Sequence, residues 1–363
     1  MGVVAIVVGL GLVGWMVLDS FDTLLATGLG SSRLSFSRRL YRIMWKPYRA
    51  VCARMEDGVG RERWLARFGP VSFVILLGAW AILEIIGWGL VWWGFRGSFG
   101  VPLPGISDAW YYSGVVYFSI GFGDVLPATG GLRLLTVVEG FTGLGTLGLV
   151  IGYLPSLYAA YSARERQLLL LDDLSDVRIT PVSLVRSYVG PDGDLTALNA
   201  MFDSWSAWCA EVYDSHTSLP VLIWFRSKHR GHSWVTGLGV VTDAAIAFAS
   251  TVPGADKGPA MRLYRQSTRL VQGLSTRVGL DEIPEPDLAA RWWSVAYSIF
   301  QTTGLELRDF DESWARVREL RREFHPYMEA FIEELLAPRG FWGVTSADHL
   351  TEVELGRLLD DDT

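Results

Sequence analysis

The chain has 363 residues, half of them hydrophobic, with a mean hydropathy of +0.25. This is too apolar for an ordinary soluble protein and too polar for one wholly embedded in lipid, so it predicts a chain divided between membrane and water. Residues 1–161 carry 12 basic and 9 acidic residues, a net charge of +3, so the total of −7 leaves −10 for residues 162–363, which argues against a nucleic-acid partner.

The first predicted element is a membrane helix within residues 1–29. Residues 1–18 are uncharged and Asp19 ends the apolar run. No basic residue precedes Arg33, whereas a signal peptide has a basic start. We therefore expect a retained span that is just long enough to cross the hydrocarbon.

Residues 30–67 form a basic linker, with ten basic residues against three acidic ones. The excess of positive charge predicts a cytoplasmic linker and an external N-terminus. Four of the basic residues recur at helical spacing: Arg39, Arg42, Lys46 and Arg49. A voltage sensor would show such spacing, but Pro47 interrupts the segment and too few spans precede it. We expect a basic interfacial helix that binds anionic lipid at 33–54, with a merely solvated basic loop as the alternative.

Residues 68–161 predict a pore domain that begins with an outer helix at 70–95. Pro70 suits a helix start, and three tryptophans mark the outer membrane interface: Trp88, Trp92 and Trp93. Glu84 lies well inside this span, where a carboxylate must face protein or water. Two readings stand for Glu84: a protonated structural residue, or a pH-sensitive gating residue.

A short helix and a glycine-containing loop are predicted at 107–124, with Ser107 or Asp108 as the helix cap. The loop reads Ser-Ile-Gly-Phe-Gly-Asp. A pore that dehydrates a cation needs successive backbone carbonyls on one side, and glycine at alternate positions permits that backbone at no steric cost. The expected ion ligands come from five residues: Ser119, Ile120, Gly121, Phe122 and Gly123. Asp124 is placed to hold the loop to its helix. A glycine turn between helices is the plainer alternative.

An inner helix is predicted at 131–161, and it is unusually rich in glycine: Gly140, Gly143, Gly145 and Gly148. Small residues permit close helix packing, or they mark a bend that opens a gate. The gating candidates here are Gly143, Gly145 and Pro155. Glu139 is expected either to hydrogen-bond behind the loop or to lie near the cavity entrance.

The stretch 106–146 resembles the pore loop and inner helix of the potassium channel superfamily, closest to bacterial channels whose pore has two membrane helices. The family pattern is Thr-Val-Gly-Tyr-Gly-Asp, and Pro127, Arg133 and Gly143 continue the match. The resemblance implies a tetramer with K⁺ at the carbonyls of the loop, and it places Tyr111 and Tyr112 in an aromatic cuff that braces the loop. Phe122 replaces a tyrosine and cannot donate a hydrogen bond to that cuff.

Residues 162–363 predict an all-α cytoplasmic domain, apart from a short strand at 170–177. Helices are expected at 181–190, 193–213, 219–227, 231–253, 257–279, 285–303, 309–336 and 346–360. No Gly-x-Gly-x-x-Gly follows a strand, so the ligand of this domain is not predicted. His229 and His232 could hold a divalent metal or sense pH together with Asp214, or they could simply lie at helix ends. Cys52 and Cys209 predict buried thiols.

The expectation is thus an all-α membrane protein: a homotetrameric K⁺-channel pore fold with an added N-terminal span, in the cell membrane, gated at the inner helices through the cytoplasmic domain by an unknown ligand or regulator. K⁺ is the permeant ion, and neither enzymatic activity nor a cofactor is expected. Two alternatives are a non-selective monovalent cation channel and a membrane sensor or enzyme whose pore module is a silent scaffold.

Overall fold

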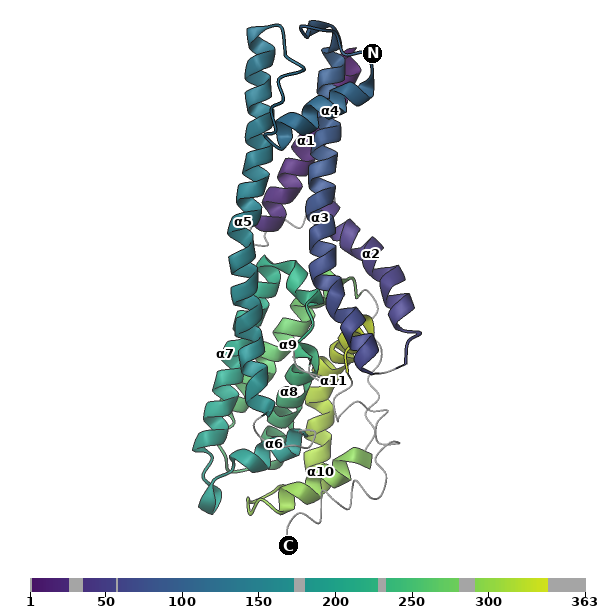
Figure 1. Cartoon of the computed structure of the whole chain (residues 1–363). Coiled ribbons are helices and arrows are strands. Elements are labelled where there is room, and N and C mark those ends of the chain that lie inside the picture. The colour runs from purple at the N-terminus through teal and green to yellow at the C-terminus, as the bar shows by residue number, and fades with distance from the viewer. Residues whose placement is uncertain are drawn as a thin grey trace. The chain divides into compact units, whose positions relative to one another are not determined.

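The computed structural model describes residues 2–25, 35–56, 58–172, 180–227, 233–280 and 291–338. These residues are mostly helical and include no strand, and a single isolated β-bridge pairs Phe99 with Pro127 (Figure 1). The predicted all-α fold is confirmed. The chain divides into two compact units, the first formed by residues 1–159 and 217–225 and the second by residues 160–216 and 226–363.

The first unit is built on three long apolar helices: α1 (Gly2–Leu24), α3 (Val59–Gly94) and the larger part of α5 (Gly130–Asp172). All three are long and apolar enough to cross a membrane, as expected for a multi-pass membrane protein. The shorter helices are α2 (Phe36–Cys52), α4 (Ile106–Tyr117) and the single turns η1 (Arg96–Ser98) and η3 (Pro220–Trp224).

Helix α1 packs antiparallel on α3 through facing glycines. Gly9 lies against Gly87, so that a Cβ atom on Gly9 would overlap the Gly87 carbonyl oxygen. Nearer the start of α1, a Cβ atom on Gly94 would come 2.8 Å from the carbonyl oxygen of Gly2. Small residues at a helix crossing let two backbones approach closely in lipid, which explains why the additional N-terminal helix can pack along the outer helix.

The end of α1 holds the start of α2. The buried carboxylate of Asp19 accepts hydrogen bonds from the backbone N–H groups of Phe36 (2.8 Å) and Ser37 (3.1 Å) and from the indole of Trp80 on α3 (2.9 Å). Because the first N–H groups of a helix lack intrahelical partners and carry partial positive charge, a carboxylate there stabilises the helix. Asp19 thus joins three helices.

Several predicted details of the first unit are wrong. Pro70 does not start the outer helix but lies inside α3, which begins at Val59. The turns before Pro70 stay helical because Leu65 and Phe68 are buried. At α4 the N-cap is Gly105, whose N–H donates 2.9 Å to the Asp108 carboxylate, so neither predicted residue is the cap itself.

Two of the tryptophans expected at the membrane interface are instead interior. Trp88 and Trp92 are almost fully buried in a cluster with Phe99, Tyr112 and other apolar side chains. Indole is large and apolar but carries one N–H donor, so it packs in a core when that donor finds an acceptor. The indole N–H of Trp88 donates to Thr142, and that of Trp92 donates to Glu139.

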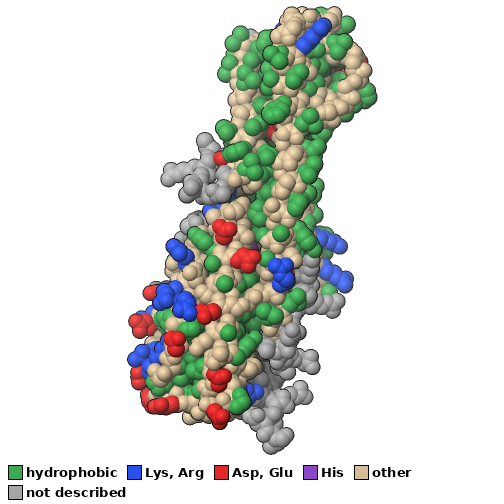
Figure 2. Space-filling view, turned by 90° about the vertical axis from the view of Figure 1, so that its left-hand side faces the viewer, with side chains coloured by type: hydrophobic (Ala, Val, Ile, Leu, Met, Phe, Trp, Pro, Cys, Tyr) green, Lys and Arg blue, Asp and Glu red, His purple; other side chains and the backbone are tan. Residues whose placement is uncertain are grey.

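The second unit is a helical bundle around α8 (Trp234–Thr251), whose residues are buried except for the half-buried Thr236 and Gly239. The other elements are α6 (Pro181–Tyr188), η2 (Pro191–Gly193), α7 (Thr196–Ser218), α9 (Gly258–Val278), α10 (Arg291–Gln301) and α11 (Phe310–Leu335). Helix α8 is also apolar enough to span a membrane, but 89% of it is buried inside the protein, so it serves as the core of this unit. On the face shown in Figure 2, charged side chains gather on the second unit, whereas the first unit shows mainly hydrophobic and uncharged side chains.

The helices expected in this unit are found with shifted ends, and residues 219–227 form only the short turn η3. The predicted strand at 170–177 is wrong where it is described, because residues 170–172 are the last turn of α5. The rest of that strand and the helix expected at 346–360 lie outside the described residues.

Candidate ion-coordinating loop

The loop after α4 has an alternating backbone. Ser119, Gly121 and Gly123 have positive φ angles of 55°, 65° and 77°, while the intervening Ile120 and Phe122 do not. In an ordinary strand successive carbonyls point to opposite sides. Reversing the handedness at every second residue is the backbone pattern that turns them toward one side. Glycine adopts positive φ without strain, but Ser119 has a Cβ atom and pays a steric cost.

The rest of the described chain leaves this loop uncovered. The exposed fractions of the Ile120 and Phe122 side chains are 52% and 68%. A Cβ atom placed on Gly121 or Gly123 would meet no atom within 4 Å. Large apolar side chains left open beside a specialised backbone indicate a surface that another molecule covers.

The two tyrosines expected to brace the loop have different partners. Tyr111 donates a 2.9 Å hydrogen bond to the Asp124 carboxylate, which ties α4 to the end of the loop. Tyr112 instead donates 2.7 Å to Thr136 on α5, because the Thr136 hydroxyl is itself a donor to the Leu132 carbonyl. The Tyr112 ring is also packed edge-on against Trp92. Of these two tyrosines, Tyr111 is therefore the one whose hydroxyl bonds to the loop.

Hydrogen bonds to backbone carbonyl groups hold both ends of the loop. The Ile120 N–H donates 2.8 Å to the Val115 carbonyl at the end of α4. Beyond the loop, the Arg133 Nε donates 3.1 Å to the Pro127 carbonyl, and Gly100 N–H donates 2.9 Å to Leu126. The loop is thus fixed at its two ends while its middle is open.

Glu139 lies behind the loop and joins three helices. It is fully buried, and its two oxygens accept hydrogen bonds from the Trp92 indole on α3 (2.6 Å) and from the Ser113 hydroxyl on α4 (2.5 Å). Of the two predicted positions for Glu139, these contacts match hydrogen bonding behind the loop. Sequence reasoning missed Trp92 and Ser113 as its partners, because no spacing rule connects residues 47 and 26 positions away.

Glu84 is the second fully buried carboxyl group in the membrane part. Its Oε1 accepts a 3.3 Å hydrogen bond from Thr146 on α5. Its Oε2 makes no hydrogen bond of normal geometry among the described residues, although the Tyr117 side chain interacts with this carboxyl group. With one normal hydrogen bond against two for Glu139, the Glu84 carboxyl group is the less well satisfied of the two.

The gating candidates on α5 differ in their surroundings. Gly143 is buried against the end of α4, and a Cβ atom there would overlap the carbonyl oxygen of Tyr117. Gly145 has open space around it within the subunit. Helix α5 continues through both glycines and through Pro155 to Asp172. The need for glycine at 143 is therefore already explained by close packing in this structure.

The predicted histidine site is not described, because His229 and His232 lie outside the described residues. Among the residues that are described, no group of three His, Cys, Asp or Glu side chains could hold a metal ion. Cys52 and Cys209 are buried free thiols, as predicted.

A comparison with known protein families finds a match to the part of the chain that contains this loop. Residues 71–159 match the family described as "Ion channel". This match shows that these residues are a pore domain of the potassium-channel type within a multi-pass membrane protein. The chain is also similar to the uncharacterized membrane protein YdjJ of Bacillus subtilis strain 168, with 23% identity over 256 residues that cover 68% of this chain and 70% of that protein. No solved structure matches.

Proposed function

We propose that the protein is a homotetrameric potassium channel of the cell membrane, with K⁺ held by the carbonyls of residues 119–123. The observation that carries the proposal is the alternation of positive φ at Ser119, Gly121 and Gly123 inside a domain of the ion-channel family. One such loop supplies one wall of a site, and a dehydrated K⁺ needs carbonyl oxygens on all sides. Four copies around an axis meet that need.

The exposed side chains of α5 support assembly. Large apolar side chains along this helix are exposed in the single chain: Leu134, Val137, Val138, Phe141, Leu144, Leu147, Ile151, Leu154 and Tyr158. A lipid-facing helix needs one apolar face, and neighbouring subunits cover further faces. Because α5 runs on as one helix from the pore domain into the second unit, it is the natural path by which that unit gates the pore.

The proposed topology places the N-terminus outside and the second unit in the cytoplasm, because the ten basic residues of 33–67 favour the inner side. Helix α2 supports contact with anionic lipid. Its outward face exposes Arg39, Arg42 and Lys46 beside apolar Ile43 and Val51, a pattern typical of helices lying in the membrane interface.

Purified protein in liposomes tests the proposal. We expect tetramers, K⁺ flux down a gradient, and a reversal potential in mixed K⁺ and Na⁺ that follows K⁺. The Gly121→Ala variant should lose flux because alanine is strained at a φ of 65°, whereas Gly131→Ala, in open space at the start of α5, should retain it. A reversal potential midway between the two ions would favour a non-selective channel, which the exposed and hydroxyl-free Phe122 makes the second candidate. An intact tetramer without flux would favour a silent scaffold.

A further inference from the structure

Residues 217–225, which we call the strap, pack in a different unit from the residues on either side of them. The chain before the strap (160–216) and after it (226 onward) belongs to the second unit, while the strap belongs to the first. The strap contains the turn η3, and Val221, Leu222 and Ile223 in it are buried. A short segment from the second half of the sequence is therefore part of the first unit, which contains the apolar helices.

Aromatic contacts hold the strap to α2 and α3. The Trp224 ring lies 4.7 Å from Trp45 of α2 and 5.6 Å from Phe68 of α3, measured between ring centroids. Both partners are 4% exposed. These separations fall in the range that aromatic pairs prefer. Trp224 thus closes a buried aromatic cluster on the basic helix.

A glycine of α3 makes room for the strap. A Cβ atom on Gly69 would come 2.7 Å from the Phe225 ring and 3.1 Å from the Trp224 carbonyl oxygen. By contrast, a Cβ atom on Gly60 of the same helix would meet nothing within 4 Å. The strap is therefore fitted closely against one defined place on α3.

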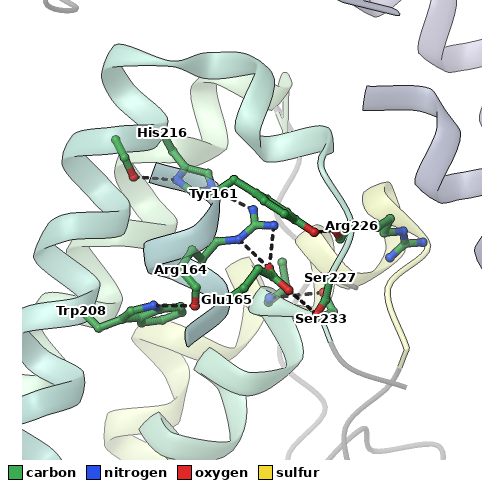
Figure 3. A network of polar contacts seen from close by, with 10 residues as sticks. Tyr161, Arg164, Glu165, Trp208, His216, Arg226, Ser227 and Ser233 are labelled. Carbon is green, nitrogen blue, oxygen red and sulfur yellow. Dashed lines mark hydrogen bonds and ion pairs between the residues drawn. The ribbon is translucent and has the colours of Figure 1, made fainter. Parts of the chain in front are cut away.

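Both ends of the strap are bonded to the last turns of α5 inside the second unit (Figure 3). His216, just before the strap, accepts a 3.2 Å hydrogen bond from the guanidinium of Arg164. Just after the strap, the Arg226 carbonyl accepts 3.0 Å from the Tyr161 hydroxyl, and the Ser227 hydroxyl donates 2.5 Å to Glu165. The same α5 is the proposed pore-lining helix.

The α5 side of this arrangement is rigid. Arg164 is 1% exposed and pairs with the Glu165 carboxylate at 3.0 Å, and its backbone carbonyl accepts 3.2 Å from the Trp208 indole. A buried, paired charge is expensive to separate from its partner. The flanks of the strap therefore move with the end of α5 rather than independently of it.

We propose that the strap couples the end of α5 to the basic helix α2 and to α3, so that a change at either end shifts the conformational equilibrium at the other. This coupling affects gating only if α5 opens the pore, and for that point the proposal rests on the proposed function. The physical reason is that a nine-residue connection, with flanks held to one helix and its middle packed on two others, cannot follow a movement of α5 unless Trp224 moves or leaves its site. Close-packed contacts of this kind switch between discrete arrangements rather than stretching.

Labelling of an introduced cysteine tests the coupling without requiring conduction. Ser156→Cys places a thiol at an exposed position of α5 outside the set of apolar side chains that lipid or other subunits are expected to cover, while the native Cys52 and Cys209 are each 1% exposed and react slowly. In full-length tetramers in liposomes, we expect Trp224→Ala to change the maleimide labelling rate at position 156 by at least about threefold, the change that a modest population shift produces. Trp45→Ala should give the same change, and the double variant no more than either single one.

Alanine variants of two glycines of α3, Gly69 and Gly60, provide a second and milder test. Gly69→Ala should change the labelling rate in the same way because it displaces the strap, and Gly60→Ala should not. If Trp224→Ala fails to form tetramers, this pair decides the question. Unchanged labelling in Gly69→Ala or in an intact Trp224→Ala tetramer would overturn the coupling, as would additive effects in the double variant. Wild-type protein that labels normally but passes no K⁺ would refute the proposed function while leaving the strap test valid.

Discussion

The indole of Trp92 donates a 2.6 Å hydrogen bond to the carboxylate of Glu139, and both side chains are completely buried. Trp92 belongs to the outer helix α3 and Glu139 to the inner helix α5, and the second oxygen of Glu139 accepts from Ser113 of α4. One carboxyl group therefore joins the three helices that position the candidate ion-coordinating loop. Polar groups in so dry an environment are costly when a partner is removed, which makes this contact a sensitive point.

Replacing Glu139 should show whether hydrogen bonding or charge matters. Glu139→Leu leaves the Trp92 N–H and the Ser113 hydroxyl without an acceptor, at a cost of about 1–3 kcal/mol for each group, so we expect a destabilised tetramer. Glu139→Gln should be tolerated, because its carbonyl can accept from Trp92 and its amide can donate to Ser113. Thermal dissociation of the tetramer, followed by gel filtration, measures both. Equal damage in the two variants would mean that the negative charge itself is required.

The two adjacent tyrosines of α4 offer a matched test of loop support. Tyr111→Phe removes the hydrogen bond to Asp124, whereas Tyr112→Phe removes one to Thr136, away from the loop. Because the Tyr111 contact ties α4 to the end of the loop, we expect the K⁺ over Na⁺ permeability ratio to fall severalfold in that variant alone. Reversal potentials in mixed salt measure the ratio. A larger fall for Tyr112→Phe would contradict the assignment.

Alanine variants at Gly143 and Gly145 distinguish a role in helix packing from a role in helix bending. Gly143→Ala forces a methyl group onto the Tyr117 carbonyl oxygen, which overpacks the α4–α5 contact at a typical cost of about 1–3 kcal/mol. We expect less assembled tetramer for Gly143→Ala and near-normal assembly for Gly145→Ala, whose methyl group enters open space. If Gly143→Ala assembles normally but its open probability falls in single-channel recordings, the residue acts as a hinge instead.

The second unit should lose stability in mild acid. Burial, aided by nearby Arg321, lowers the pKa of His325 to about 3, and burial beside Arg164 lowers the pKa of His216 well below its usual value. Both imidazoles are thus neutral in the folded protein, and the unfolded chain binds more protons below about pH 6.5. The free energy of unfolding therefore falls as the pH drops from about 6.5 toward 3, and is unaffected by these groups above that range.

Hydrogen exchange in α11 of the full chain measures this effect. Between pH 7.5 and 5.5 the His325 contribution is about 1.4 kcal/mol, so His325→Gln should lose about that much less than wild type over this range. At pH 7.5 and above, His325 is neutral in both the folded and the unfolded chain, so the stabilities of the two proteins should differ by a constant amount there. If both proteins lose the same unfolding free energy between pH 7.5 and 5.5, protonation of His325 does not contribute to the loss.

The sequence predicted the helical class, the order of the spans and the loop itself because these depend on neighbouring residues. A run such as 1–18 is apolar whatever surrounds it, and Gly121 and Gly123 permit positive φ wherever they lie. Local rules failed where distant contacts decided the outcome. Pro70 reads as a helix start but lies inside α3, and Trp92 reads as an interface residue but is buried.

What the amino-acid order determined on its own was thus a chain with membrane helices around a loop whose backbone can present carbonyls to an ion. Only the tertiary structure decided that Glu139 meets Trp92 and Ser113, that Tyr111 rather than Tyr112 holds Asp124, and that the strap packs on Trp45 and Gly69. The physical reason is that hydropathy and glycine conformation act within a few residues. Hydrogen bonds and ring contacts between residues 13 to 179 positions apart form only once whole helices have packed.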